Sequence, residues 1–319
     1  AKRLTVPDDF FVLSQSIAFQ FYDLNNYNTG LFRTFSDGSA RNLSYTIGLS
    51  RNNKGVNPIF PTYGSEFGLI GKFTFPYSLV NGIDYADLKN QEAYKLKNNT
   101  INEITGNNGE IIQPGDYINS AGNTVGKDYT AAAEDQGKID QKRFNWLEYY
   151  KIKFKADWFT KIYGKLVLRS LGEFGYLGSY NKDRGIVPFE RFYVGGDGLA
   201  NFAQDGREVI QLRGYPNNSL SSSDGGTIYN KFSLEMRYPI TLKAAASIYV
   251  LSFLEAGSSW DTFRQYNPFS LKRSAGAGLR IFMPAFGLLG IDFGYGFDTL
   301  TGETKAHGME THFIIGQQF

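Results

Sequence analysis

The sequence predicts an all-β protein, a transmembrane antiparallel β-barrel with long extracellular loops. Its composition is the first reason, since aromatic residues make up 16% of the 319 residues and there are 36 Gly. Membrane barrels place aromatics in two interfacial girdles and glycines where strands bend or crowd. The second reason is an alternation of apolar and polar residues over segments long enough to cross a bilayer.

The alternation is clearest between Tyr149 and Phe159. Apolar residues occupy every second position from 150 to 158, and Lys or Asp occupies each position between them. Successive side chains of a strand point to opposite faces, so the segment has one apolar and one charged face. The same pattern recurs in 41–51, 229–239 and 288–298.

A half-buried sheet in a soluble β-sandwich would also alternate, so strand length and polarity must decide between the two folds. The alternating segments are about 9–12 residues long, as tilted membrane strands are, whereas soluble strands are about 5–6 residues long. Their polar faces carry charges and glycines, which suit a wet lumen, and their apolar faces end in aromatics. We therefore expect a membrane barrel.

About ten strands are expected, joined alternately by short periplasmic turns and long external loops. The strands are placed near 10–22, 41–51, 65–76, 147–159, 165–177, 229–239, 246–257, 271–282, 288–298 and 311–319. The long connections are 23–40, 78–146, 178–228, 258–270 and 299–310. An even number of strands places both chain ends on the periplasmic side.

The segment 78–146 is expected to be a large extracellular loop. It is rich in Asn, Gly, Asp and Lys, and the stretches 85–97 and 131–141 could form short surface helices. We expect a mobile loop rather than a dedicated binding site.

Composition and motifs give no support for catalysis. The chain has no Cys, and its net charge of +2 gives no basis for a nucleic-acid partner. The two histidines, His307 and His312, have no acid and nucleophile placed as in a triad, and no metal-ligand spacing is present. We expect no enzyme activity, no catalytic residue, no cofactor and no metal.

A glycine run lies in the segment 178–228, which we expect to be one long loop. Gly195, Gly196 and Gly198 surround a single aspartate. A phosphate-binding loop would need a following Lys-Ser/Thr and a strand-to-helix setting, and both are missing from the pattern. The simplest interpretation of the run by itself is a flexible turn.

The same loop carries Arg213, Gly214 and Tyr215, an Arg-Gly-aromatic motif. Together with Pro188–Phe192 and the glycine run, it resembles the lid loop of the BamA family of outer-membrane protein assembly factors. The resemblance covers most of the chain outside 78–146. It continues, in chain order, through Phe60–Gly64, Phe253–Gly257, Arg273–Arg280, Gly287–Gly290 and Ile315–Phe319.

The resemblance implies that the lid loop, 178–228, folds back into the lumen and that Arg213 pairs with an acid of the barrel wall. Glu255 stands at the expected position, between Phe253 and Gly257, where the family more often has Asp. A lumenal Glu and a loop Arg can form a bidentate, charge-assisted pair. A glycine after the arginine would let the backbone approach the wall closely, and the tyrosine would add contact area.

The last strand is the second element that the resemblance marks. Phe313, Ile315, Gln317 and Phe319 share one face. In the family the closing strand meets the first barrel strand in a weak seam. Such a seam would allow lateral opening, and an incoming strand could pair with the exposed edge.

Family members have about sixteen barrel strands, preceded by periplasmic POTRA domains, so the chain resembles their carboxyl-terminal barrel portion. We expect residues 1–4 to end a strand that is already under way, before a periplasmic turn at 5–9. Residue 1 does not begin a signal peptide, so the start is expected to be a processed or truncated end.

The resemblance implies an assembly factor, in the outer membrane of a Gram-negative bacterium, that folds and inserts other barrel proteins through the seam. Its partners would be nascent outer-membrane β-barrel proteins, periplasmic or surface lipoproteins of an assembly complex, the lipid bilayer and lipopolysaccharide. Two alternatives stay open from the residues alone: a passive porin or solute channel, and a related protein-secretion transporter.

Overall fold

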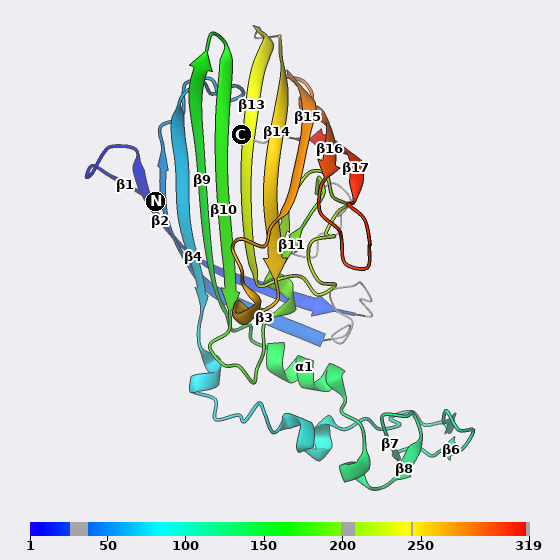
Figure 1. Cartoon of the computed structure of the whole chain (residues 1–319). Helices are drawn as coiled ribbons and strands as arrows, with labels where there is room; N and C mark the ends of the chain where they lie inside the picture. The colour runs from blue at the N-terminus through cyan, green and yellow to red at the C-terminus, as the bar shows by residue number, and fades with distance from the viewer. Residues whose placement is uncertain (26–37, 199–207, 244, 317–319) are drawn as a thin grey trace.

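The computed structural model describes residues 1–25, 38–198, 208–243 and 245–316, and it confirms the all-β fold class. Eleven strands of this described part form one antiparallel sheet, in which spatial order follows chain order (Figure 1). They are β1 (Lys2–Leu4), β2 (Phe11–Leu24), β3 (Gly38–Asn52), β4 (Gly64–Thr74), β9 (Tyr150–Tyr163), β10 (Leu166–Gly178), β13 (Ile228–Lys243), β14 (Ala246–Trp260), β15 (Lys272–Met283), β16 (Gly287–Gly296) and β17 (Gly308–Ile315).

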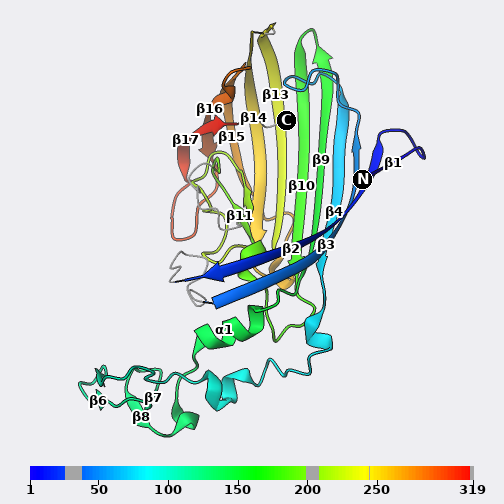
Figure 2. The ribbon, with the colours of Figure 1, turned by 180° about the vertical axis from the view of Figure 1, so that it is seen from behind.

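Each of the ten expected strands corresponds to a strand of this sheet, with ends that differ by a few residues. The short strand β1 is the eleventh, and it pairs with β2 where the sequence suggested the end of a strand. The sheet curls, so that β2 and β3 turn away from the direction of β9 to β14 (Figures 1 and 2). Within the described residues the sheet is not closed, and β1 and β17 are its edges.

The strands turn their apolar side chains outward and their charges inward. On β13, Phe232 is 49% exposed, whereas Glu235 is 4% exposed and Arg237 is also buried. A soluble sheet would bury the aromatic face instead, because burying apolar surface is favourable in water. The inverted arrangement suits a sheet with lipid outside and a polar lumen inside.

The lid loop lies within the curve of the sheet, beside β13 and β14 (Figures 1 and 2). It contains a 3-10 turn, η5 (Pro188–Glu190), and two short strands, β11 (Phe192–Val194) and β12 (Glu208–Ile210), which pair in parallel. Its apolar residues form a buried cluster with residues of the wall strands. That cluster includes Tyr149, Leu177, Phe192, Tyr193, Val194, Leu212, Tyr215 and Tyr229.

A second buried cluster forms where the turn between β3 and β4 folds onto the inner face of the sheet. Phe60 of this turn is 1% exposed, and its ring packs edge-on against Tyr249 at a centroid distance of 5.3 Å. Phe159, Val167, Leu251 and Phe253 complete the cluster. A short turn therefore covers part of the lumen away from the lid.

The segment between β4 and β9, which includes the expected extracellular loop, carries short elements and a small buried core of its own. Residues such as Tyr85, Leu88 and Ile112 are buried within it. Its elements are η1 (Tyr77–Leu79), η2 (Leu88–Asn90), η3 (Glu92–Tyr94), β5 (Ile104–Thr105), β6 (Ile111–Ile112), β7 (Tyr117–Ile118), β8 (Thr124–Gly126), η4 (Tyr129–Ala131) and α1 (Gln136–Phe144). This segment forms an extension that projects beyond one end of the sheet (Figure 2).

The helix expected over 131–141 begins later, because the side chain of Asp135 caps it by accepting from the backbone N of Lys138 at 3.1 Å. The stretch 85–97 forms two 3-10 turns instead of a helix. In the described part of the chain, no helix is both long enough and apolar enough to cross a membrane.

Candidate functional site

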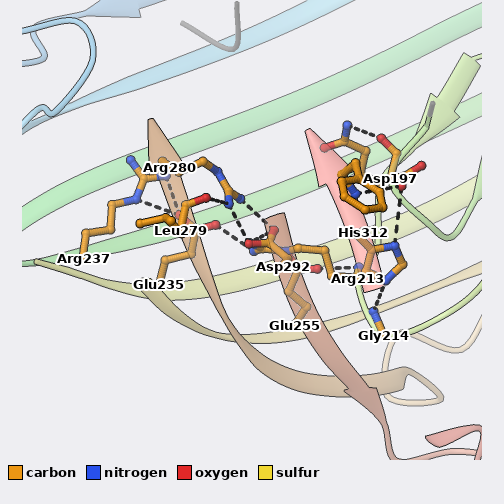
Figure 3. A network of polar contacts seen from close by, with 12 residues as sticks. Asp197, Arg213, Gly214, Glu235, Arg237, Glu255, Leu279, Arg280, Asp292 and His312 are labelled. Carbon is orange, nitrogen blue, oxygen red and sulfur yellow. Dashed lines mark hydrogen bonds and ion pairs between the residues drawn. The ribbon is translucent and has the colours of Figure 1, made fainter. Parts of the chain in front are cut away.

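The site is centred on Arg213, which the lid loop carries onto the inner face of the sheet (Figure 3). Its guanidinium donates to Glu255 at 2.6 Å and to Glu235 at 2.7 Å, and its Nη1 lies 3.2 Å from Asp292. The backbone N of Arg213 also donates to Glu255, at 2.8 Å. The structure thus brings Arg213 and Glu255 together and adds two carboxylates from other strands.

Glu255 faces the lumen with Phe253, as the alternation requires. The guanidinium carbon of Arg213 lies 3.8 Å from the centroid of the Phe253 ring, which is a close cation–π contact. The planar guanidinium therefore stacks on the ring while its edge reaches the carboxylates. A lysine ammonium could not make this set of contacts, because it is a compact charge without a planar fork.

Two of the carboxylates that bind Arg213 also pair with other arginines. Arg280 makes two hydrogen bonds to Asp292, at 2.6 and 2.7 Å, and Arg237 and Arg169 both contact Glu235. Buried charges are stable only when they are paired and hydrogen-bonded. The result is a lumenal network of alternating sign that joins the lid to β13, β14 and β16.

Gly214 brings the lid backbone against the wall. Its φ of +85° is a left-handed conformation, and an added Cβ would lie 2.8 Å from the Cβ of Ser274. Its N–H donates to Nε2 of His312 on β17 at 2.8 Å. On the wall side, Gly257 leaves space for the lid, since a Cβ there would lie 2.5 Å from Leu212.

Tyr215 is fully buried and ties two wall strands together. Its hydroxyl donates to the carbonyl of Arg273 on β15 at 2.7 Å and accepts from the N–H of Asp298, just after β16, at 3.2 Å. Burial raises the pKa of the Tyr215 hydroxyl, so it stays protonated and able to donate. The three motif residues therefore contact the wall in three different ways.

The glycine run is a defined turn in which two parts of the lid lie side by side. Gly195, Gly196 and Gly198 have φ values of +123°, +74° and +79°. The backbones of Gly196 and Leu212 exchange hydrogen bonds of 3.0 and 3.1 Å. The run thus places Asp197 close to the Arg-Gly-aromatic motif.

A second group of charges, which the sequence did not single out, holds the other side of the lid. Glu190 contacts Lys72 at 2.6 Å and Lys151 at 3.1 Å, and Glu208 contacts Lys151 at 2.7 Å. Burial favours the neutral form of Glu190, but Lys151 and then Lys72 outweigh it and hold its pKa below the usual value. The run of alternate lysines on β9 was the signal that could have suggested this group.

The expected seam residues are described in part. Phe313 and Ile315 lie on the exposed outer face of β17, whereas Gln317 and Phe319 lie outside the described residues. His312 is buried beneath Gly214, and His307 contacts Glu303 and Glu310. No group of three His, Asp or Glu side chains gathers as a metal site would among the residues that the structure describes.

A polar cavity of about 320 Å³ lies on the inner face, between the lid and the Phe60 turn. Arg213, Glu235 and Glu255 line it from the network, and Pro58 and Ile59 line it from the turn. The site therefore combines a polar interior with a lid that is held to the wall by buried charges.

Comparison with known proteins identifies relatives of this chain. The Omp85 superfamily domain matches residues 136–319, more than half of the chain. The outer membrane protein assembly factor BamA of Neisseria meningitidis serogroup B (strain ATCC BAA-335 / MC58) is 30% identical over 116 residues, which cover 36% of this chain and 14% of that protein.

A solved structure extends the similarity of fold to almost the whole chain. The crystal structure of BamA from Haemophilus ducreyi lacking POTRA domains 1-3 has a TM-score of 0.56 and 14% sequence identity, and the match covers 97% of this chain. The match spans 52% of that chain, so the present chain corresponds to about half of it. At this identity the similarity concerns the fold alone.

Proposed function

Because this chain belongs to the Omp85 superfamily, we propose that it is the barrel of an assembly factor that folds and inserts other β-barrel proteins into the outer membrane. The similarity to BamA of N. meningitidis, an outer membrane protein assembly factor, supports this function over the others considered. Its substrates would be nascent outer-membrane β-barrel proteins. Periplasmic or surface lipoproteins of an assembly complex would be its partners.

The observation that carries the proposal is the attachment of the lid to the wall through Arg213. Three carboxylates on β13, β14 and β16 hold one arginine within the curve of the sheet. A passive pore needs a continuous water-filled lumen, which a buried lid would obstruct. An insertion factor needs a stable wall and a weak edge, and a lid that crosslinks the wall strands suits that requirement.

The other requirement would be met at the proposed seam beside the last strand, β17. In the described residues it pairs with β16 alone. An exposed strand edge carries unpaired N–H and C=O groups and can template another strand. In the proposed mechanism, a substrate strand pairs at this edge and the free energy released as its own barrel closes drives insertion, without nucleotide or covalent chemistry.

The proposed orientation follows from the length of the connections. The extension between β4 and β9 would lie outside the cell and the short turns in the periplasm, where both ends of the chain would face. The apolar outer surface would contact the lipid bilayer and lipopolysaccharide. Protease added to intact cells should cut the extension but not the β9–β10 turn.

Depletion of the full-length protein tests the function directly. We expect the outer-membrane content of barrel proteins to fall, and we expect the wild-type gene to restore it. A variant with Arg213→Ala should restore less, whereas Arg264→Ala, a change in the exposed β14–β15 loop, should restore fully. Unchanged barrel content after depletion, together with a stable open conductance in liposomes, would favour a channel instead.

A further inference from the structure

Lys231 is a buried cation on the inner face of the sheet. It lies on β13, where the odd-numbered side chains from 231 to 237 point inward, and it is 7% exposed. Its ammonium forms no hydrogen bond or ion pair with the residues that the structure describes. A buried charge is costly unless another group compensates it, so Lys231 differs from the paired arginines of the site.

Two acids on neighbouring strands are already held by other cations. Glu173 on β10 lies directly opposite Lys231, but its carboxylate contacts Lys155 of β9 at 3.5 Å. Glu255 on β14 attracts Lys231 at longer range. Its two carboxylate oxygens accept from the side chain and the backbone N of Arg213, at 2.6 and 2.8 Å. Neither carboxylate therefore neutralises Lys231 by direct contact.

Ser233 is the next residue on the same face of β13. It is 3% exposed, and its hydroxyl is buried without a hydrogen-bond partner in the described part of the chain. Successive side chains on one face of a strand are about 7 Å apart. A hydroxyl can donate one hydrogen bond and an ammonium three, so the two side chains offer donors to one ligand placed between them.

Both side chains line the polar cavity of about 320 Å³ between the lid and the Phe60 turn. The other lysines and arginines of its lining are paired with carboxylates. These pairs are Lys54–Glu66, Lys155–Glu173, Arg169–Asp157, Arg213–Glu255, Arg237–Glu235 and Arg280–Asp292. Among the described residues, Lys231 is thus the cation of the lining that no acid contacts, and its surroundings favour an anion.

The site does not depend on an edge of the sheet. β13 is an interior strand, with β10 on one side and β14 on the other. Gln211 of the lid and Ile59 of the turn line the same cavity from the lumenal side. The described residues themselves therefore bury Lys231 and Ser233 and bound the space that these side chains face.

We propose that Lys231 and Ser233 form a binding site for one small oxyanion of the phosphate or sulfate class. The ammonium supplies the charge and, with the hydroxyl, donates hydrogen bonds to the oxygens of the ion. The site lies on the inner face, away from the apolar surface that would contact lipid, so its ligand is a free ion rather than a lipid phosphate. Such a site is additional to the proposed function and does not depend on it. The competing interpretation is that Lys231 is hydrated and only offsets the charge of Glu255 at a distance.

Equilibrium dialysis with ³²P-labelled phosphate tests the site directly. The full-length protein in detergent micelles should bind phosphate saturably, and binding should be lost in Lys231→Met, which keeps a long side chain without the charge. Lys231→Arg should retain binding, and Ser233→Ala should weaken it about fivefold. The matched control Lys305→Met, at an exposed lysine of the β16–β17 loop, should bind as the wild type does.

Competition distinguishes the source of the ion. Unlabelled sulfate should displace the bound phosphate, whereas short-chain phosphatidic acid should not. Displacement by phosphatidic acid would overturn the assignment of a free ion.

Unfolding by heat provides a second measurement. At constant ionic strength, phosphate at about a hundred times its dissociation constant should shift the folding equilibrium of the wild type about a hundredfold and leave that of Lys231→Met unchanged. In phosphate-free buffer, Lys231→Met should unfold no earlier than the wild type, because the change removes a buried charge that has no contacting partner.

Two results would overturn the proposal: no saturable binding by the wild type, or equal binding by Lys231→Met. Earlier unfolding of Lys231→Met in phosphate-free buffer, with no stabilisation of the wild type by phosphate, would support the competing interpretation instead. Neither readout involves barrel insertion. Failure of the oxyanion site would therefore leave the proposed function intact, and unchanged barrel content after depletion would refute the proposed function alone.

Discussion

Replacing Arg213 with alanine should release the lid from the wall. Of its three partners, Glu235 keeps Arg237 and Arg169, and Asp292 keeps Arg280. Glu255, which is 4% exposed, forms its ion pair with Arg213. The change therefore leaves one buried carboxylate poorly compensated, a defect that costs about 3–5 kcal/mol.

The lid itself provides the readout for this prediction. The chain contains no Cys, so a single cysteine at the fully buried Leu212 would react with a maleimide only when the lid opens. A loss of about 4 kcal/mol corresponds to an opening equilibrium that is roughly a thousandfold more favourable. The Arg213→Lys protein should be labelled faster than the wild type and more slowly than Arg213→Ala, because lysine keeps a charge but loses the stacking on Phe253.

A double-mutant cycle separates the ion pair from the packing of the arginine. Glu255→Gln removes the uncompensated charge, so Arg213→Ala should cost clearly less in that background than in the wild type. Arg264→Ala, in the exposed β14–β15 loop, serves as the control. Labelling of the Arg213→Ala protein at the wild-type rate, or equal costs in both backgrounds, would refute the account of the network.

Three further predictions use the same labelling assay. Gly214→Ala should destabilise the closed lid by about 2 kcal/mol or more, because the added Cβ would clash with the wall. Gly185→Ala, with a similar φ of +84° but open space around it, should leave the lid closed. Equal labelling of the two variants would contradict the steric argument. Tyr215→Phe should weaken closure by about 1 kcal/mol, since it removes hydrogen bonds to two strands, and an unchanged rate would show that these bonds add nothing. The pKa of Glu190 is lowered in the folded protein, so this carboxylate should stabilise the closed lid at pH values above its unfolded pKa of about 4.5 and lose that effect as the pH falls through the lower folded pKa. Glu190→Gln should show weaker closure at pH 7 and no loss of closure on this acid step. An acid step that persists in Glu190→Gln would exclude this carboxyl as its source.

The strands could be predicted because their signal is local. On β13 and β9 the alternation of residues decides which face is apolar, and it needs no information from other parts of the chain. The extension between β4 and β9 lacks such a period. Its buried Tyr85 and Ile112 come together only through its own tertiary fold, so its order could not be predicted from composition.

The site was predictable only where a motif carried it. Arg213 and Glu255 were named from a resemblance, and the structure brings them together. Glu235 and Asp292 were missed, because the sequence does not say which acids on different strands lie at the same height along the strands of the sheet. That height is set by the pairing register: Glu235 lies opposite Phe253, and Asp292 lies opposite Gly278.

By itself, the sequence determined the fold class, the number and approximate ends of the long strands, and which of their faces is charged. Those properties follow from a period of two and from the length of each strand, both of which are local. Only the tertiary structure decided which side chains meet: the three carboxylates around Arg213 and the lysines around Glu190. These contacts join residues that are distant in the chain, and strand register, sheet curvature and the path of the lid set them together.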